Sequence, residues 1–467
     1  MLTRLSIKGF KNLHQTEVFF GPLTCLSGSA GAGKSNLLEA IRLLQLLAGG
    51  SLDSALTQIA PFDTAERAAL LRHKNKAARL EFEADVLIDP NGVDETGRDL
   101  RATANHLRYQ LRLKWVAKKD EPGHFEIEEE QLSPVPPNRH GYQLHFPHAN
   151  HWRTSLLTEP VAKDTLFIQT SREKAGKVIS LVPDRVPAKP IEVLGEGLKA
   201  TVLSSCPSDF PTAWLLAREM QSWVAGQLPD NAPSRAQLGR WASRRDQQAA
   251  KTPGDSGALG KLAAGLDPFC EEGLRFHIDT GGQVDIEAKS GLRLPPAALS
   301  STGRRALNLL TTLAAEDEHP VLCWDDLDQA FPADQAEKVL DLLRGFITRV
   351  DDFHDETNPP RQIIFTANDP AWLFGCGLDE WLRVETTSPG SARFGFPRGS
   401  WRAAATPGAK GWPTSKWGEP PELAEETATP TTQTTGRKPG KPKPPAHPML
   451  PFGDVTPEED LVPETTG

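Results

Sequence analysis

The sequence has few cysteines and no long hydrophobic run. Its five cysteines are scattered over 467 residues without a Cys-x-x-Cys pair, so neither a disulfide framework nor a zinc site is indicated. No stretch reaches the roughly 18 apolar residues that a membrane span needs, and the first residues lack the apolar core of a signal peptide. We therefore expect a cytoplasmic protein without a membrane partner.

The chain also lacks an excess of positive charge. It has 52 lysines and arginines against 61 aspartates and glutamates, which gives a formal net charge of -9. This balance argues against a surface coated for non-specific nucleic-acid binding, although it leaves room for a local basic surface.

Apolar residues are scarce as well. They make up 38% of the chain, whereas prolines number 40 and glycines 38, which predicts that part of the chain is not packed. From Ala403 onward the composition narrows to Pro, Thr, Gly, Lys and Glu. We therefore predict a folded head over residues 1–402 and a disordered tail over residues 403–467.

The most informative segment is a glycine-rich loop between a predicted strand and a predicted helix. Residues 28–35 read GSAGAGKS, which fits the pattern G-x-x-x-x-G-K-[ST]. Glycines allow successive N–H groups to turn inward around phosphate oxygens, and the N-terminus of the following helix adds positive potential. Lys34 would reach the β- and γ-phosphates of ATP, and the Ser35 hydroxyl would take one position on Mg²⁺. The predicted nucleotide-binding residues here are Gly28, Ser29, Ala30, Gly31, Ala32, Gly33, Lys34, Ser35 and Asn36.

A second segment provides the acidic partner that such a loop needs. The apolar residues 321–324 predict a strand that delivers Asp325 and Asp326 at its carboxyl end, where ligands bind in open α/β sheets. We predict that Asp325 holds Mg²⁺ through water and that Asp326 is the hydrolytic base, with Asp328 as the competing assignment. A further buried-looking strand ends at Asn368, whose amide could orient water.

The rest of the chain predicts an α/β protein with added parts. Three runs that alternate apolar and polar residues, ARLEFEADVLI, HLRYQLRLKWV and HFEIEEEQLSPV, predict an antiparallel β subdomain over about residues 78–200. Helix-like segments predict a short helical insertion over about residues 207–265, followed by a strand, a turn and a strand in LRFHIDTGGQVDIEAKSGLRL. The strands before the glycine-rich loop are assigned to the nucleotide-binding lobe.

Two further segments leave alternatives open. Residues 138–160 contain four histidines, which fit ordinary polar loop residues better than a metal cluster, because no ligand spacing is fixed. Ser300, Ser301 and Gly303 precede a helix that bears Arg304 and Arg305, which fits either a second anion site or an ordinary capped helix.

Taken in order, five segments resemble the landmarks of SMC/RecF/OLD-like ATPases, which have ABC-type heads within the wider AAA group of P-loop proteins. They are LSIKGFKNL, GSAGAGKS, LSSTGRRAL, VLCWDD and IIFTANDP, and the resemblance spans residues 1–397. It implies an ABC-type head in which Ser300 and Gly303 complete the γ-phosphate site of a second subunit, so that two ATPs lie between two heads. It also implies that Lys11 lies near the phosphates and that Gln58 is a candidate metal-sensing glutamine.

The chain departs from that family at two positions. Relatives usually have Glu where this chain has Asp326 and His where it has Asn368, so we expect slow turnover. Neither a nuclease domain nor long coiled-coil arms are apparent. The resemblance then implies an ATP-dependent homodimer or higher homo-oligomer that regulates a separately encoded effector, as in bacterial anti-phage defence. One alternative is a DNA-repair or chromosome-associated ATPase that binds duplex DNA, and another is a nucleotide-locked scaffold that does not hydrolyse ATP.

Overall fold

The structure is a computed structural model, and most of the first 406 residues are described in it. The described ranges are 1–72, 79–118, 121–136, 144–159, 161–162, 164–174, 176–184, 189–249, 257–270, 274–314, 320–387, 390–406 and 411. The chain divides into two units, Met1–Gly418 and Glu419–Gly467, and only the first contains described residues. The predicted disordered tail therefore lies almost wholly outside the described residues.

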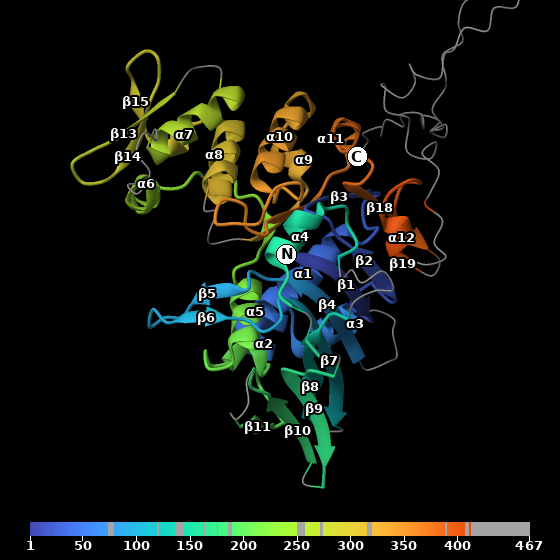
Figure 1. Cartoon of the computed structure of the whole chain (residues 1–467). Coiled ribbons are helices and arrows are strands. Elements are labelled where there is room, and N and C mark those ends of the chain that lie inside the picture. The colour runs from blue at the N-terminus through green and yellow to red at the C-terminus, as the bar shows by residue number, and fades with distance from the viewer. Residues whose placement is uncertain are drawn as a thin grey trace, which may run out of the picture. The chain divides into compact units, whose positions relative to one another are not determined.

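A mostly parallel sheet forms the centre of the first unit. Its strand order is β12–β16–β17–β3–β18–β19, and β19 alone in this sheet of described strands runs antiparallel to its neighbour. Figure 1 labels three of these strands, β3, β18 and β19. The strands are β3 (Leu23–Gly28), β12 (Val224–Gln227), β16 (Val321–Asp325), β17 (Gln362–Thr366), β18 (Trp381–Thr387) and β19 (Ser391–Gly395). The apolar runs in β3, β16 and β17 are thus strands, as the sequence predicts.

Both faces of this sheet are buried, which explains why its strands are apolar throughout rather than alternating. Leu26, Cys323 and Ile364 belong to one core cluster, with the apolar side of α1 (Lys34–Gly49). Their neighbours in the same strands, among them Cys25 and Phe365, belong to a second cluster with α8 (Ser301–Ala314) and α10 (Ala336–Phe346). The phosphate loop therefore emerges from a sheet that is held on both sides.

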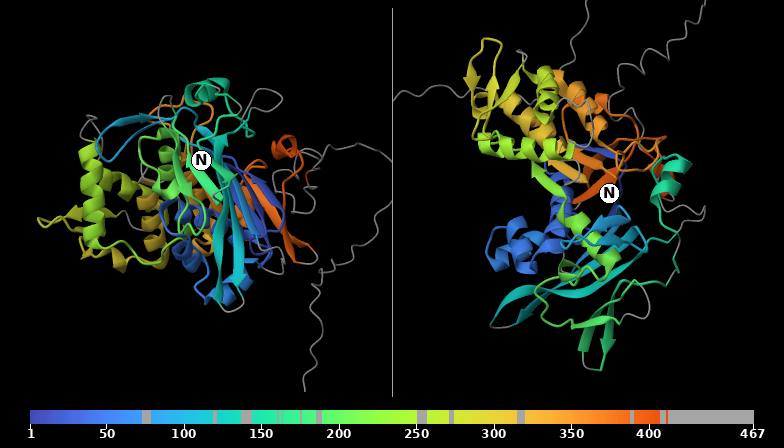
Figure 2. Two further views of the ribbon diagram at one scale, coloured as in Figure 1. Left: turned by 90° about the horizontal axis from the view of Figure 1, so that it is seen from below. Right: turned by 60° about the vertical axis from the view of Figure 1, so that its left-hand side comes forward.

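The predicted antiparallel subdomain is present, but it recruits the first two strands of the chain. In the described chain its order is β11–β10–β9–β8–β7–β4–β1–β2. The strands are β1 (Leu2–Lys8), β2 (Thr16–Phe19), β4 (Arg79–Leu87), β7 (His106–Lys118), β8 (Glu121–Pro134), β9 (Ile168–Glu173), β10 (Gly176–Leu181) and β11 (Ile191–Leu194). The three alternating runs are β4, β7 and β8, which pair in sequence order. Figure 2 shows this sheet extending away from α8 and α10.

The two sheets are joined through the side chain of Gln362 on β17. Its amide Nε2 donates to the carbonyls of Leu2 and Gly21, both at 2.8 Å, and its Oε1 accepts from the Leu2 N–H at 2.8 Å. Gln362 is fully buried, and these three bonds satisfy its amide. The N-terminal strands are thus bonded to the parallel sheet, although their own sheet is the antiparallel one.

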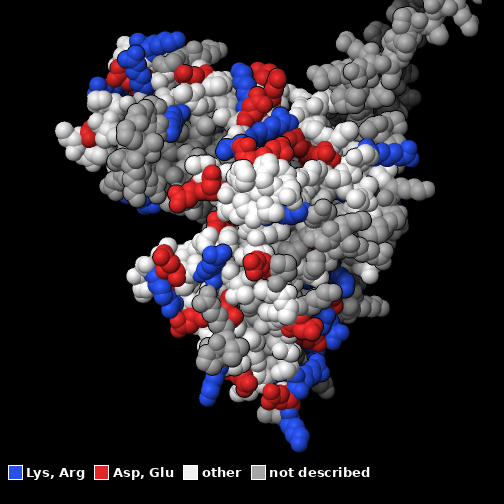
Figure 3. All heavy atoms as spheres, viewed as in Figure 1, with Lys and Arg blue, Asp and Glu red and all other residues white. Residues whose placement is uncertain are grey.

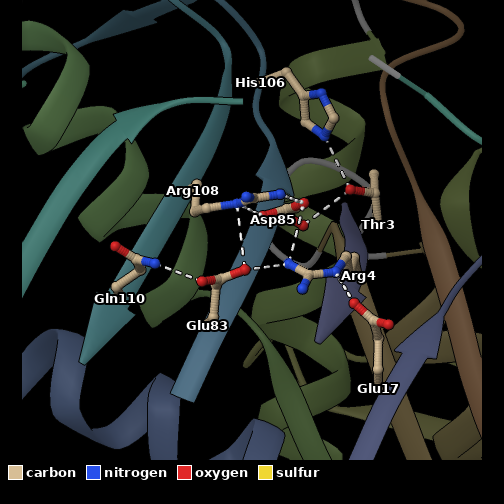
Figure 4. Close-up of polar contacts among 8 residues, drawn as sticks. All are labelled: Thr3, Arg4, Glu17, Glu83, Asp85, His106, Arg108 and Gln110. Carbon is tan, nitrogen blue, oxygen red and sulfur yellow. Dashed lines mark hydrogen bonds and ion pairs between the residues drawn. The ribbon is translucent and has the colours of Figure 1, made fainter. Parts of the chain in front are cut away.

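The polar face of the antiparallel sheet carries a network of ion pairs across β2, β1, β4 and β7 (Figure 4). Arg108 donates from Nε and Nη2 to the two carboxylate oxygens of Asp85, each at 2.7 Å. Arg4 bonds to Glu17 at 2.6 Å and to Glu83 at 2.5 Å. Opposite charges placed across neighbouring strands favour this register over a shifted one.

The predicted helical insertion contains one strand as well as helices. Its helices are α5 (Pro211–Gln221), α6 (Arg235–Ala249) and α7 (Ala258–Leu266). The segment after α5 was predicted to continue as helix, but residues 224–227 form β12 at the edge of the parallel sheet, beside β16. Backbone pairing with a buried strand outweighs the local preference of four residues. The next prediction is confirmed, because β13 (Arg275–Ile278) and β14 (Val284–Glu287) form a hairpin.

The remaining elements are short. They are α2 (Leu52–Ile59), α3 (Thr64–Arg72), β5 (Asn91–Val93), β6 (Asp99–Arg101), α4 (Asn150–Leu156), β15 (Arg293–Leu294), α9 (Leu327–Ala330), α11 (Pro370–Gly375) and α12 (Arg402–Ala405), with 3₁₀ turns at Leu203–Ser205, Asp267–Phe269, Pro296–Ala298 and Ala333–Gln335. No helix within the described ranges is long and apolar enough to cross a membrane.

The packed head continues beyond residue 402. Arg402 is 1% exposed and donates to the carbonyls of Phe19 at 2.9 Å and Asp379 at 2.6 Å. Its Nη2 also lies 3.4 Å from the Thr24 hydroxyl, and Ala405 is buried. The predicted boundary was placed on composition, which does not reveal that one buried arginine ties α12 to the core.

Candidate functional site

The glycine-rich loop follows β3 and leads directly into α1, as predicted. Gly28 and Gly33 have φ of +150° and +114°, a region that other residues rarely adopt. A Cβ at Gly28 would overlap the carbonyl of Val384 on β18, and one at Gly33 would lie 2.7 Å from the Ala392 side chain on β19. Since Gly33 is the N-cap of α1 and offers no side-chain acceptor, the first N–H groups of the helix remain available for an anion.

Lys34 folds back over this loop. Its Nζ donates to the carbonyls of Gly28 at 2.7 Å and Ser29 at 3.1 Å, and its side chain is buried. Burial lowers the pKa of the Lys34 ammonium, and the negative charges of three aspartates act in the opposite direction. Those aspartates are Asp326, Asp325 and Asp328. The structure therefore brings the two predicted halves of the site within electrostatic reach of each other.

The acidic strand ends with two differently held carboxylates. Asp325 is the last residue of β16, and its Oδ1 accepts a 2.7 Å bond from the hydroxyl of Thr366 at the end of β17. The same hydroxyl accepts from the Asp326 N–H at 2.7 Å. Asp326 has φ of 50° and ψ of 49°, a left-handed conformation that Asp tolerates better than most residues. Burial and then the charges of Asp325 and Asp328 raise the pKa of Asp326.

Thr366 is a site residue that was not predicted from the sequence. The available signal was a lone polar residue at the carboxyl end of a buried strand, QIIFT, but nothing local indicated that β17 lies directly beside β16. Through its two bonds Thr366 orients the carboxylate of Asp325 and holds the strained backbone of Asp326.

The competing residue Asp328 is occupied by backbone contacts. Its Oδ2 accepts from the N–H groups of Asn368 at 2.6 Å and Asp369 at 2.9 Å, which ties α9 to the segment after β17. Its Oδ1 is buried without a hydrogen-bond partner among the described residues. The Asn368 residue is exposed, and its backbone N–H takes part in this contact.

The resemblance assigned Lys11 and Gln58 to the site, and of these two described residues only Lys11 has a hydrogen bond to α1. Lys11 is close to the first turns of α1, since its Nζ bonds to the carboxylate of Glu39 on that helix. Gln58 is exposed on α2, where its amide lies 3.5 Å from the Ser54 hydroxyl. The recorded contact of Gln58 is thus within its own helix.

Ser300 and Gly303 form the capped start of α8. The Ser300 hydroxyl accepts from the Gly303 N–H at 3.1 Å, and Ser300 is exposed. Gly303 is buried, and a Cβ there would lie 3.3 Å from both Cys270 Sγ and Leu299 Cβ. The Arg304 guanidinium bonds to the carbonyl of Leu299 at 2.7 Å. These contacts lie within one lobe of a single chain, so the proposed action on a second subunit stays a prediction.

The histidine-rich segment is only partly described. His148 bonds to the carbonyl of Phe146 at 2.7 Å, His151 lies 2.7 Å from the carbonyl of Asp351, and His140 lies outside the described residues. In the described part of the chain, no group of three or more His, Cys, Asp or Glu side chains is arranged to hold a metal ion.

A phosphate-binding loop on one strand and acidic residues on the next strand but one are how P-loop ATPases bring a nucleotide and its metal ion together. Here the loop follows β3, the aspartates follow β16, and β17 lies between them. The chain therefore has the fold of a P-loop ATPase head of the ABC type, with an antiparallel β subdomain, and this prediction is confirmed.

Comparison with known proteins agrees with that class. Residues 4–123 match the family model described as AAA domain. No curated protein matches the chain. The fold and this match together indicate ATP binding and ATPase-type activity.

Solved structures similar to this chain include three SMC heads. One is an SMC head bound to the C-winged helix domain of ScpA, with 14% identity, 84% of this chain and 96% of that chain covered, and a TM-score of 0.44. Another is the SMC head domain from Thermotoga maritima, with 12% identity, 85% and 98% covered, and a TM-score of 0.36. The third is an SMC head domain with an extended coiled coil, bound to the C-terminal domain of ScpA derived from Pyrococcus furiosus, with 12% identity, 84% and 95% covered, and a TM-score of 0.43.

Proposed function

We propose that this chain binds ATP with Mg²⁺, hydrolyses it slowly, dimerises on ATP and thereby regulates a separately encoded effector. The observation that carries the proposal is the placement of Lys34, which is buried over the loop, bonded to two of its carbonyls and within electrostatic reach of three aspartates. Its present acceptors are two neutral carbonyls, and charged phosphate oxygens are stronger acceptors for an ammonium. Lys34 would therefore turn from Gly28 and Ser29 to the phosphates without leaving the loop.

The other site residues have separate proposed roles in binding phosphate, binding Mg²⁺ and accepting a proton. The N–H groups of residues 28–35 cradle phosphate oxygens, and Ser35 and Asp325 hold Mg²⁺, which neutralises charge on the phosphates when bound. Thr366 keeps the Asp325 carboxylate in one orientation. Asp326 takes the proton of the attacking water.

Slow turnover is supported by the short side chain of Asp326 and by the amide of Asn368. Its side chain is one methylene shorter than Glu, and a displacement of about 1 Å can cost roughly 10²-fold in rate. Asn368, which stands where relatives usually have His, cannot carry a proton at neutral pH, so the help that this position gives to hydrolysis is weakened too. We expect turnover below about one per second.

Titration with ATP tests the central claim. Lys34→Ala should abolish ATP binding and phosphate release while the circular dichroism spectrum is retained. Lys8→Ala is the matched control, because Lys8 is an exposed lysine that pairs with Glu81 on the antiparallel sheet. Near-native ATP affinity in a folded Lys34→Ala protein would overturn the proposed function.

The scaffold alternative is favoured by the contacts of Asp328, whose Oδ2 accepts from two backbone N–H groups. With Asp325 assigned to Mg²⁺, the base within the described β16–α9 segment is then Asp326, whose side chain is one methylene shorter than Glu. ATP-stable dimers without phosphate release would favour it. Direct binding of duplex DNA has less support, because acidic and basic side chains are interspersed on the face shown in Figure 3. Phosphate release that rises with added duplex DNA would favour the DNA alternative.

The effector proposal rests on the resemblance to stand-alone heads, including those of anti-phage defence. Co-expression with the products of neighbouring genes tests it. A partner that co-purifies with the wild type in ATP but not with Lys34→Ala would support it, and co-purification independent of ATP would contradict regulation by nucleotide.

A further inference from the structure

Asn12 lies in the connection between β1 and β2, yet its side chain reaches the end of the phosphate loop. The side chain is 8% exposed. Its Nδ2 donates to the carbonyl of Ala32 at 3.3 Å, and its Oδ1 accepts from Asn36 Nδ2, in the first turn of α1, at 2.8 Å. A Cβ at Gly33 would lie 2.8 and 2.9 Å from the same two amide atoms. The amide of Asn12 thus lies against Ala32 and Gly33.

The backbone of Asn12 bonds to a third element. Its carbonyl accepts from the Ala392 N–H on β19 at 2.9 Å, and Ala392 is also the residue that closes over Gly33. Asn12 therefore connects the loop, the first turn of α1 and the β18–β19 hairpin.

The contact with the Ala32 carbonyl fixes the direction of the next N–H. In a trans peptide the C=O of one residue and the N–H of the following residue point to opposite sides. Because Asn12 holds the Ala32 carbonyl on its own side, the Gly33 N–H points to the opposite side of that peptide, away from Asn12. Glycine at position 33 has little intrinsic preference that would maintain this direction.

We propose that Asn12 is a positioning residue for nucleotide binding, which sets the Gly33 N–H toward the phosphates by holding the Ala32 carbonyl and the Asn36 amide. This inference rests on the proposed ATP-binding function. It assigns a role in preorganisation: without Asn12 the loop is free to rotate the peptide between Ala32 and Gly33, and binding must first restore its direction.

Asn12→Asp removes the donor but also adds a negative charge near the phosphates, so it is compared with Asn12→Ala, which removes the donor without adding a charge. An ionised Asp is nearly isosteric and still accepts from Asn36, but it cannot donate to the Ala32 carbonyl. We expect affinities for ATP and ADP to fall about 10-fold or more, and by similar factors, because a bond to a phosphate is made in both complexes. KM for ATP should rise accordingly, whereas kcat at saturating ATP should change less than about threefold.

Asn12→Ala provides a second variant, in which we expect the same loss of affinity and faster amide hydrogen exchange in residues 28–36. Asn105→Ala is the matched control. Asn105 is 1% exposed and donates to the carbonyls of Ile88 and Leu156, both at 3.0 Å, on the antiparallel side of the head. It should lose thermal stability without a change in ATP affinity.

The outcomes separate this inference from the function on which it rests. If the wild type does not bind ATP, the proposed function fails and the inference fails with it. If the wild type binds ATP and both Asn12 variants bind it equally tightly, only the role of Asn12 is overturned. A fall in kcat without a rise in KM would also overturn it, since that pattern belongs to a residue of the chemical step.

Discussion

Asp326 combines a left-handed backbone with a raised pKa at the carboxyl end of β16. A residue in this conformation is held by its surroundings, and here the holding contact is the bond from the Asp326 N–H to Thr366. Asp and Asn both tolerate such a backbone, so replacement by Asn removes the base without changing the fold.

Asp326→Asn should therefore lower phosphate release at least 10-fold without loss of ATP binding. Asp328→Asn should act mainly on stability, because its carboxylate accepts from the N–H groups of Asn368 and Asp369. Single-turnover phosphate release and thermal melting of both variants distinguish the two roles. If Asp328→Asn alone stops release at unchanged melting temperature, Asp328 is the base. Fast wild-type turnover that neither change affects would contradict both assignments.

Strands β7 and β8 carry two buried ionisable groups of opposite behaviour. Glu130 on β8 is fully buried and accepts from the N–H groups of Val202 at 2.7 Å and Leu203 at 2.9 Å, yet burial raises its pKa from 4.5 to about 7. His106 on β7 lies 2.9 Å from the Thr3 hydroxyl, and burial lowers its pKa from 6.5 to about 4.

These shifts predict opposing effects of pH on stability. Glu130 holds its proton more tightly in the folded state. Its stabilising contribution to the free energy of unfolding is therefore fully present below pH 4.5 and is lost as the pH rises toward 7. His106 holds its proton less tightly in the folded state. Its stabilising contribution to the free energy of unfolding is therefore fully present above pH 6.5 and is lost as the pH falls toward 4. Between about pH 4.5 and 6.5, the fall in the free energy of unfolding due to Glu130 and the rise due to His106 cancel.

Glu130→Gln should remove the opposing effect of Glu130, so that the pH dependence of stability due to His106 becomes measurable. We expect the free energy of unfolding of this variant, relative to wild type, to rise with pH by up to about 1.4 kcal/mol per pH unit between 4.5 and 6.5. Urea unfolding of both proteins at several pH values measures it. His106→Gln is the reciprocal variant and should show the opposite slope. Parallel pH profiles for wild type and Glu130→Gln would contradict the assignment.

The start of α8 decides how the proposed dimer is best tested. Gly303 is buried against Cys270 and Leu299, so a large residue there should destabilise the head itself. Ser300 is exposed and offers the cleaner position, at the cost of about 1 kcal/mol for the lost helix cap.

Ser300→Arg should leave ATP binding by the monomer unchanged but block ATP-dependent dimerisation, because the cation would occupy the proposed phosphate site of the partner. Light scattering with and without ATP measures the outcome. Ser290→Arg is the control, an exposed serine between β14 and β15. ATP-dependent dimers that form equally in Ser300→Arg would rule out the sandwich arrangement.

At the scale of the whole molecule, α12 belongs to the packed head through the buried Arg402 and Ala405, whereas composition placed the boundary after residue 402. Removing residues 419–467 should leave the melting temperature unchanged, because the predicted tail has too few apolar residues to contribute core contacts. Removing residues 402–467 should lower it by several degrees, since the three hydrogen bonds of Arg402 contribute on the order of 3 kcal/mol. Calorimetry of both truncations, with Arg402→Met in the full chain as the matched variant, measures this. Equal melting temperatures would show that α12 is dispensable.

Features that depend on neighbouring residues alone were predictable from the sequence. Eight consecutive residues define the phosphate loop, because each glycine, the lysine and the serine act through their own backbone or side chain. The apolar runs of β3, β16 and β17 and the alternating runs of β4, β7 and β8 were also readable, since burial on two faces or one face sets the pattern within a single strand.

Which distant segments lie side by side could not be predicted in this way and follows from the three-dimensional fold. The bond from Thr366 to Asp325 spans 41 positions, that from Asn12 to Ala32 spans 20, and that from Arg402 to Phe19 spans 383. The recruitment of β1 and β2 into the antiparallel sheet, and of β12 into the parallel one, depends likewise on strands distant in sequence. Residue patterns fix which face of a strand is buried, but they carry no information on which other strand lies beside it, and the contacts that orient Asp325 and Gly33 follow from that neighbourhood.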